Sequence, residues 1–272
     1  TIVNATALDF ATSSVGFNLS ATATTGDITQ TGGGLTVTGA STFITEATGS
    51  NIILDHASNA FTGSVTLKAA TAGDEAFGNI TFRDNGAVNF NSSAAGANDL
   101  FIDALVNGAI SGNLSLTASG AITINTAIST IGGSVTMVGA GISSIVGGTI
   151  TTTAAANSGT ISGAVDLSAT GAGTISLAGA ITTTGADSNV DATVASAGGD
   201  VTISTINGAV SVAAITASGG DGNTNNVDGG DSGYVDITAG TAGTLTIDGV
   251  IEALGGAFND IGGPVESDGL HG

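Results

Sequence analysis

Residues 199–220 read GDVTISTINGAVSVAAITASGG and contain three short runs in which apolar and polar side chains alternate. In the first run, Val201 and Ile203 alternate with Thr202 and Ser204, and the runs AVSV and AITA follow. Successive side chains of a β-strand point to opposite faces, so alternation with a period of two predicts three half-buried strands. A segment of this size cannot bury its apolar face alone, and it therefore has to pack against other segments.

The same pattern returns along the chain. It reads GNLSLTASGAITINTAISTIG at 112–132, GAVDLSATGAGTISLAGAITTTG at 163–185 and GYVDITAGTAGTLTIDGVIEALG at 233–255. The first glycines of the four segments follow one another at intervals of 51, 36 and 34 residues. Unequal intervals indicate one repeating unit with insertions of variable length. Units that must stack on copies of themselves are typical of solenoids.

The size of the unit predicts a right-handed parallel β-helix with about three short strands per rung. A turn of roughly 20–25 residues is typical of a solenoid repeat. About eleven rungs at ~4.8 Å would give a rod on the order of 50 Å long. The right-handed coil follows from the usual hand of parallel crossovers. An antiparallel β-sandwich is the alternative, but it needs hairpin turns, and Asn-Gly pairs occur only at 85–86, 107–108 and 207–208.

The composition supports a strand-rich fold with almost no helix. Hydrophobic residues make up 41% of the chain but aromatic residues only 4%, and there are 45 glycines and a single proline, Pro264. Thr, Val and Ile favour strands, whereas the helix-favouring Lys, Arg and Met are nearly absent. Regular apolar alternation argues against a disordered chain.

One continuous solenoid accounts for the whole chain better than two domains. We expect an irregular first rung or cap at 1–23, a solenoid at 24–256 with loop insertions near 186–198 and 219–233, and a tail or truncated rung at 257–272. Eight of the nine phenylalanines lie at or before Phe101, which indicates two types of rung. A start at Thr1 without an initiator Met is consistent with a mature chain or a piece of a longer protein.

The charge of the chain excludes several kinds of partner. The net charge of −20 leaves no basic face for nucleic acid or for anionic lipid. No apolar run reaches the ~18–20 residues that a membrane helix needs, so we expect no membrane insertion. The absence of cysteine is typical of many bacterial surface proteins and also fits a cytosolic chain.

Several segments resemble the repeats of large bacterial surface exoproteins of the filamentous-haemagglutinin-like and autotransporter-like type. The segments are GDITQTGGGLTVTG at 26–39, NAFTGSVTLKA at 59–69 and the coil at 198–220, and the resemblance covers about residues 24–256. It implies a right-handed β-helical stalk, secreted and exposed at the cell surface, that serves adhesion, biofilm or surface structure. No segment matches the secretion domain or the translocator of such proteins, and the resemblance carries over no functional residues.

The scarcity of basic residues argues against an enzyme. β-Helices that cleave acidic polysaccharides need paired acids or a basic residue that abstracts a proton. Lys68 and Arg83 are the only basic residues besides histidine. We expect them to stack on one outer face and to pair with Asp84 or Glu75. The sequence also lacks a nucleophile elbow, a phosphate-binding loop and Cys/His metal spacing.

One acidic loop suggests a calcium site. Asp221, Asn223, Asp228 and Asp231 fall within the glycine-rich segment 219–233. Calcium prefers six to eight oxygen ligands, and glycine allows a backbone to fold around the ion. The spacing fits neither the EF-hand nor the GGxGxD repeat, so a solvated acidic insertion is the alternative. Calcium is the only cofactor that the sequence suggests.

Two functions remain. The first is a structural or adhesive rod-like segment of an extracellular bacterial surface or fibre protein, which associates with itself or with neighbouring repeats of a longer chain. The second is a calcium-dependent, glycan-binding or protein-binding module that uses the acidic insertion loops to bind a host or cell-surface partner. Tyr234 is the only Tyr or Trp, and carbohydrate sites usually need aromatic platforms, so the sequence favours the rod.

Overall fold

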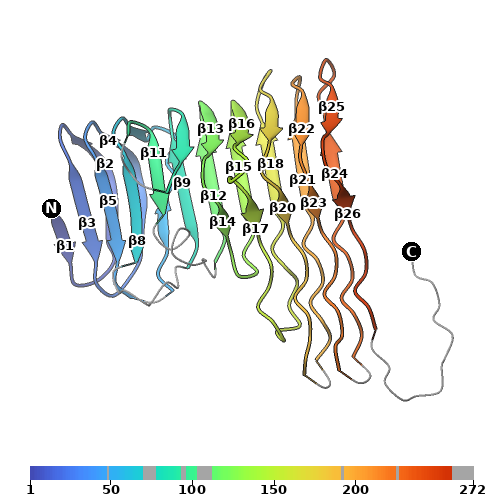
Figure 1. Cartoon of the computed structure of the whole chain (residues 1–272). Helices are drawn as coiled ribbons and strands as arrows, with labels where there is room; N and C mark the ends of the chain where they lie inside the picture. The colour runs from blue at the N-terminus through green and yellow to red at the C-terminus, as the bar shows by residue number, and fades with distance from the viewer. Residues whose placement is uncertain are drawn as a thin grey trace, which may run out of the picture.

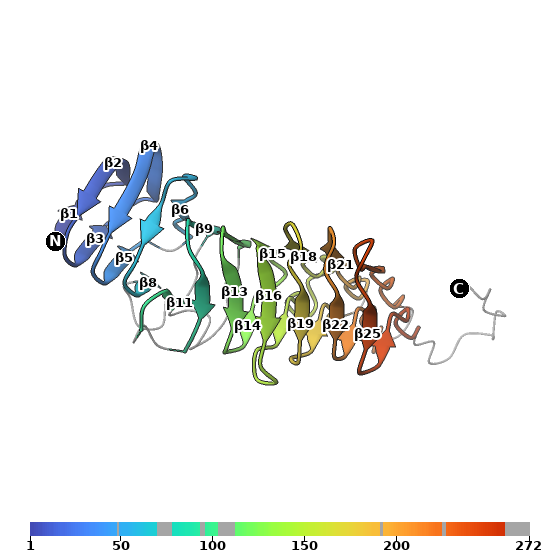
Figure 2. The same ribbon diagram turned by 90° about the horizontal axis from the view of Figure 1, so that it is seen from above.

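A computed structural model shows an elongated stack of β-strands (Figures 1 and 2). The structure describes residues 1–47, 49–69, 78–92, 96–102, 112–190, 193–224 and 227–258. Every regular element in these residues is a strand, and none of them contains a helix long and apolar enough to cross a membrane. The strands form three sheets that run along the stack.

The first sheet has eleven strands. In spatial order they are β1 (Ile2–Asn4), β3 (Leu19–Ala23), β5 (Ser41–Thr45), β8 (Val65–Ala69), β11 (Asp99–Ile102), β10 (Val88–Phe90), β13 (Ala121–Ile124), β16 (Gly141–Ser144), β19 (Ile175–Leu177), β22 (Val210–Val212) and β25 (Leu245–Ile247). β11 follows β10 in the sequence but lies between β8 and β10 in the sheet. This is the one reversal of strand order in the described part of the first sheet.

The second and third sheets keep strict sequence order. The second sheet contains β2 (Leu8–Val15), β4 (Ile28–Val37), β6 (Ile52–Leu54), β9 (Ile80–Asp84), β12 (Leu114–Ala118), β15 (Val135–Gly139), β18 (Val165–Ala169), β21 (Val201–Thr205) and β24 (Val235–Thr238), with β7 (Ala60–Phe61) beside β4. The third contains β14 (Ile128–Ser129), β17 (Ile150–Thr151), β20 (Ile181–Thr182), β23 (Ile215–Thr216) and β26 (Ile251–Glu252).

Every ladder between the described strands is parallel, which confirms the parallel β-helix and excludes the antiparallel sandwich. Apolar residues stack in register along the inside of the rungs. In the second sheet, Leu116 pairs with Met137, Met137 with Leu167, and Leu167 with Ile203, and all four are fully buried. The right-handed coil stays a prediction.

The two types of rung predicted from the phenylalanines differ in their number of sheets. Up to β11 the described rungs have only the first and second sheets, and the third sheet begins at β14. Phe10, Phe43, Phe61 and Phe82 form a column in the early rungs, with ring centroids 5.9, 6.1 and 5.3 Å apart from one ring to the next. Large aromatic rings thus fill the two-sheet interior, while Ile, Val and Leu fill the three-sheet interior. The first rung consists of β1 and β2, and both strands pair with the next rung, β1 with β3 and β2 with β4. Two register shifts interrupt the β2–β4 ladder at Ala11.

A glycine corner precedes most strands of the second sheet. The corner glycines are Gly78, Gly112, Gly133, Gly163, Gly199 and Gly233, and each packs on the corner of the rung before it. A Cβ atom on Gly163 would lie 2.0 Å from the carbonyl oxygen of Gly133, so no other residue fits there. Gly133 begins a rung inside the 51-residue interval that the sequence pattern left undivided. Along the described chain, eleven strands stack in the first sheet and nine along the path of the second.

At several corners, the residue after the glycine ties one rung to the next. Asn79 donates its backbone N–H to the side-chain oxygen of Asn51 (2.7 Å), and its own side-chain oxygen accepts the N–H of Asn113 (3.0 Å). Asn113 accepts the N–H of Ser134 in the same way (2.8 Å). Asp27 begins this ladder, by accepting the N–H of Asn51 (2.8 Å). These side chains satisfy backbone donors at a corner where the sheet hydrogen bonds are interrupted.

Candidate binding groove

The insertions of the later rungs form a flat projection, which we call the fin. Its described residues are 152–163, 183–190 with 193–199, and 217–224 with 227–233, three excursions between the third sheet and the second, and residues 253–258, which run out from β26 (Figure 1). The base of each complete excursion is closed by one backbone bond. Gly199 N–H donates to Thr183 O at 2.8 Å, and the equivalent bonds in the excursions on either side measure 3.0 and 2.8 Å.

The fin is hydrogen-bonded in two directions although its described residues form no strand beyond one isolated bridge, between Ser188 and Gly222. Gly230 N–H donates to Gly220 O within one excursion (2.8 Å), while Gly220 N–H donates to Ser196 O and Gly256 N–H to Gly230 O between excursions (3.0 and 2.8 Å). A Cβ atom on Gly230 would lie 2.0 Å from Ser196 O, and one on Gly256 would lie 1.8 Å from Gly220 O. The glycines of the acidic loop are therefore required by the close approach of neighbouring chain segments.

Two of the four predicted calcium ligands, Asp221 and Asn223, lie in an outgoing leg of the fin, where Asp187 and Asp221 cap backbone N–H groups. Asp187 accepts the N–H of Asp221 (2.8 Å) through one carboxylate oxygen, and the other oxygen lies 3.4 Å from the side-chain nitrogen of Asn223. Asp221 in turn accepts the N–H of Ala257 (2.7 Å). This ladder repeats the arrangement of the corner asparagines, with a carboxylate in place of an amide.

The other two predicted ligands, Asp228 and Asp231, lie in the return leg of the same excursion and line a groove. The structure thus divides the four residues into two pairs with different surroundings. Within the described ranges, no three His, Asp or Glu side chains are grouped closely enough to hold a metal ion. Calcium at this loop stays a prediction.

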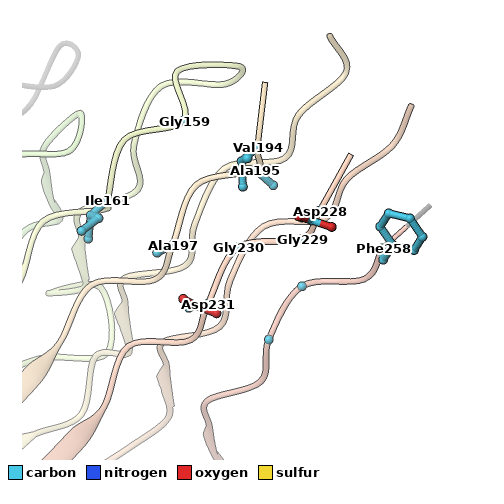
Figure 3. Close-up of a pocket in the computed structure, with 12 residues that line it drawn as sticks. Gly159, Ile161, Val194, Ala195, Ala197, Asp228, Gly229, Gly230, Asp231 and Phe258 are labelled. Atoms are coloured by element: carbon cyan, nitrogen blue, oxygen red, sulfur yellow. The ribbon is translucent and has the colours of Figure 1, made fainter. Parts of the chain in front are cut away.

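The groove has a volume of about 840 Å³ and crosses four successive passes of the chain. Its lining residues are Gly159, Ile161, Val194, Ala195, Ala197, Asp228, Gly229, Gly230, Asp231, Gly255, Gly256 and Phe258. Ile161, Val194 and Phe258 are 68%, 53% and 47% exposed. Figure 3 shows Ile161 and Val194 on one side, Phe258 on the other, and the two aspartates between them. The groove therefore combines exposed apolar side chains with two exposed carboxylates and a glycine backbone.

No basic side chain lines this groove. Lys68 lies in β8 of the first sheet and Arg83 in β9 of the second, so the expectation that they stack on one outer face is wrong. Asp84 is not their partner either, because it alternates with Arg83 and points inward. It is only 4% exposed and accepts the N–H of Phe61 (2.9 Å). Glu75 lies outside the described residues.

A buried polar cluster near β9 was not predicted from the sequence. Gln30 and Asn59 exchange two side-chain hydrogen bonds of 2.6 and 2.9 Å inside the early rungs. Asn59 also accepts the N–H of Leu35 (2.9 Å) and donates to Leu54 O (3.1 Å). Nearby, burial raises the pKa of the Asp84 carboxyl above its usual value, against the hydrogen bonds that it accepts from backbone N–H groups. Gln30 and Asn59 satisfy each other's hydrogen bonds, and Asp84 accepts backbone N–H groups, so the buried polar groups stabilise the interior. In the sequence, only the position of Gln30 in an alternating strand indicated burial.

Comparison with known proteins gives one match. Residues 1–68, from β1 into β8, match a family described as repeats of unknown function (DUF5649). No curated protein and no solved structure matches the chain. The match covers a quarter of the chain and ends before the third sheet and the fin begin, so the groove lies outside the region of similarity.

Proposed function

We propose that this chain is a structural and adhesive rod-like segment of an extracellular bacterial surface or fibre protein, and that it performs no catalysis. The observation that carries the proposal is the repeated tie between successive rungs. Parallel ladders and stacked corner glycines join successive rungs, and capping side chains add ties from Asp27 to Ala164 and from Asp200 to Tyr234. These ties favour a rigid rod of fixed length and shape.

The ends of the stack support an assembly of repeats. β24 and β25 form the last described rung and have a neighbour on one side only. Leu245 and Ile247, which continue the inward apolar columns of the first sheet, are 45% and 47% exposed there. An open parallel edge with exposed apolar residues favours pairing with a further rung. Neighbouring repeats of a longer chain fit this edge.

The surface chemistry supports the absence of catalysis. The two basic residues lie in different sheets, and within the described residues no group of three acidic or histidine side chains gathers to form a metal site. Asp221 and Asp187, the acids of the outgoing legs, cap backbone donors. These two acidic residues therefore stabilise the backbone of the fin.

Two measurements test the proposal. Small-angle scattering together with light scattering, with calcium and with a chelator, measures shape and molar mass, and we expect a rod in both buffers. Antibodies raised against the folded chain should label intact cells of the source organism. A compact particle in solution, or labelling only after the cells are made permeable, would contradict the rod or its surface location.

The binding-module alternative is favoured by one observation, which is the groove on the fin. Its residues Asp228 and Asp231 belong to the acidic insertion at 219–233. A protein partner suits it better than a glycan, because Phe258 is the only aromatic side chain that lines it.

A further inference from the structure

We infer that the groove on the fin binds an extended, basic peptide segment of a partner protein, with apolar side chains of the peptide against Ile161, Val194 and Phe258 and its Lys or Arg side chains against Asp228 and Asp231. This inference goes beyond the rod function and does not depend on it.

The shape of the groove fits an extended backbone. The groove is lined in turn by Gly159 and Ile161, by residues 194–197, by residues 228–231 and by residues 255–258. Four passes at the spacing of neighbouring strands span about 14 Å, which is about four residues of extended peptide at ~3.3 Å each. In pass four, Gly255 is exposed, and a Cβ atom there would have no neighbour closer than 3.9 Å, so the backbone is open to close approach at this position.

The apolar wall gives the peptide surface to bury. Ile161, Val194 and Phe258 come from three different excursions, yet the fin brings them to one groove, and each is about half exposed or more. Clustered apolar side chains around a concave surface mark interaction sites on soluble proteins, whereas single ones do not. Burial of these side chains by one or two apolar residues supplies the non-directional part of the affinity.

The carboxylates define the charge of the occupant. Asp228 and Asp231 are both exposed, and three residues of extended leg separate them by about 10 Å. The whole chain has 22 acidic residues and 2 Lys and Arg. A second copy of the chain therefore brings more negative charge to the groove and cannot neutralise it. Nucleic acid is repelled for the same reason. Both carboxylates lie in the third pass, so a foreign segment whose basic side chains project to either side where it crosses that pass is complementary, and this pairing fixes its position along the groove.

Fluorescence anisotropy with a defined probe tests the inference on the full chain. The probe is a labelled hexapeptide with two adjacent lysines at its centre, a valine on either side of them and serines at its ends, because neighbouring side chains of an extended peptide point to opposite sides. We expect saturable binding that weakens with salt, because exposed charge pairs are screened. The same peptide with glutamine in place of lysine should bind about fivefold more weakly, since two exposed pairs at about 0.5 kcal/mol each add up to about 1 kcal/mol.

Matched variants separate the groove from general charge. The double variant Asp228→Asn, Asp231→Asn should raise the Kd about fivefold or more, and Val194→Ser should raise it as well. The control Asp166→Asn, Asp236→Asn removes the same charge from exposed positions on the second sheet and should change the Kd less than twofold. All four aspartates are exposed, and circular dichroism should show unchanged folding.

Three outcomes would overturn the inference. They are the absence of saturable binding up to millimolar peptide, equal weakening by the groove variant and the control variant, and equal binding of the lysine and glutamine peptides. Each outcome leaves the scattering and labelling tests of the rod untouched, so the two proposals fail separately.

Discussion

Two adjacent glycines provide a test of how tightly the rungs are stacked. Gly147 and Gly148 lie in the turn between β16 and β17. A Cβ atom on Gly148 would lie 2.2 Å from Ile124 O, in the rung below, whereas a Cβ atom on Gly147 would have only the end of the Ile145 side chain near it, at 3.9 Å. We expect Gly148→Ala to destabilise the protein strongly and Gly147→Ala to leave it nearly unchanged.

The magnitude follows from the stacking. Non-bonded heavy atoms attract at about 3.5–4.0 Å, so the new methyl group would have to move more than about 1 Å away from the carbonyl oxygen. The backbone bonds of the neighbouring strand limit this movement. Ile128 N–H donates to Thr149 O at 2.8 Å, and Ile150 N–H donates to Ala180 O at 3.0 Å. Losing both at about 1 kcal/mol each, with an overpacking term of about 1–3 kcal/mol, gives about 3–5 kcal/mol.

Thermal unfolding followed by circular dichroism measures the difference. For a chain of this size, 1 kcal/mol shifts Tm by roughly 2–4 °C, so Gly148→Ala should lower Tm by about 6 °C or more. Gly147→Ala should change it by no more than about 2–4 °C, in either direction. If both variants unfolded at the same temperature as the wild type, the rungs would be far more loosely stacked than the corner and turn glycines indicate.

Three further predictions concern hydrogen bonds and a buried charge. Asn79→Ala removes the acceptor of the Asn113 N–H and should cost about 0.5–1.5 kcal/mol in urea unfolding, while Asn79→Asp keeps an acceptor and should cost less. Thr183→Val deletes a fully buried hydroxyl that donates to a corner glycine and should cost about 1–3 kcal/mol, whereas Thr182→Val, at the half-buried residue before it at the end of β20, should change stability by less than about 0.5 kcal/mol. Burial raises the pKa of Asp84, so the contribution of this carboxyl to stability is fully present below its ordinary pKa and is lost as the pH rises through the raised value. In urea titrations at successive pH values, the wild type should lose stability relative to Asp84→Asn over this window. A difference that did not vary with pH would contradict the raised pKa.

The strands could be predicted because each carries its own signal. The run DVTIS gave β21, and the runs AVSV and AITA gave β22 and β23, since alternation of apolar and polar residues is a local property that parallel stacking preserves. The rung that begins at Gly133 was missed because local alternation does not show where one rung ends and the next begins. The segment from 112 to 132 already reads as a complete unit, and nothing within it marks that the next corner follows at once.

The groove could not be predicted because its residues are brought together by stacking between rungs. Ile161, Val194 and Phe258 are 33 and 64 residues apart in sequence, and the lengths of the excursions decide that they meet. The acidic loop was recognised, but its composition could not show that Asp221 caps a backbone donor while Asp228 faces a groove. The division depends on which leg of the excursion each residue occupies.

The reversed order of β10 and β11 bears on how the protein forms as it emerges from a ribosome or a secretion pore. β10 pairs only with β11 and β13 among the described strands, and both come later in the chain. Rung-by-rung growth from the N-terminus therefore stops after β9, because β10 has no finished strand on which to add. Growth resumes only when Asp99–Ile102 has arrived and returned to β8. The early rungs thus complete themselves as a unit before the three-sheet part can be built on them.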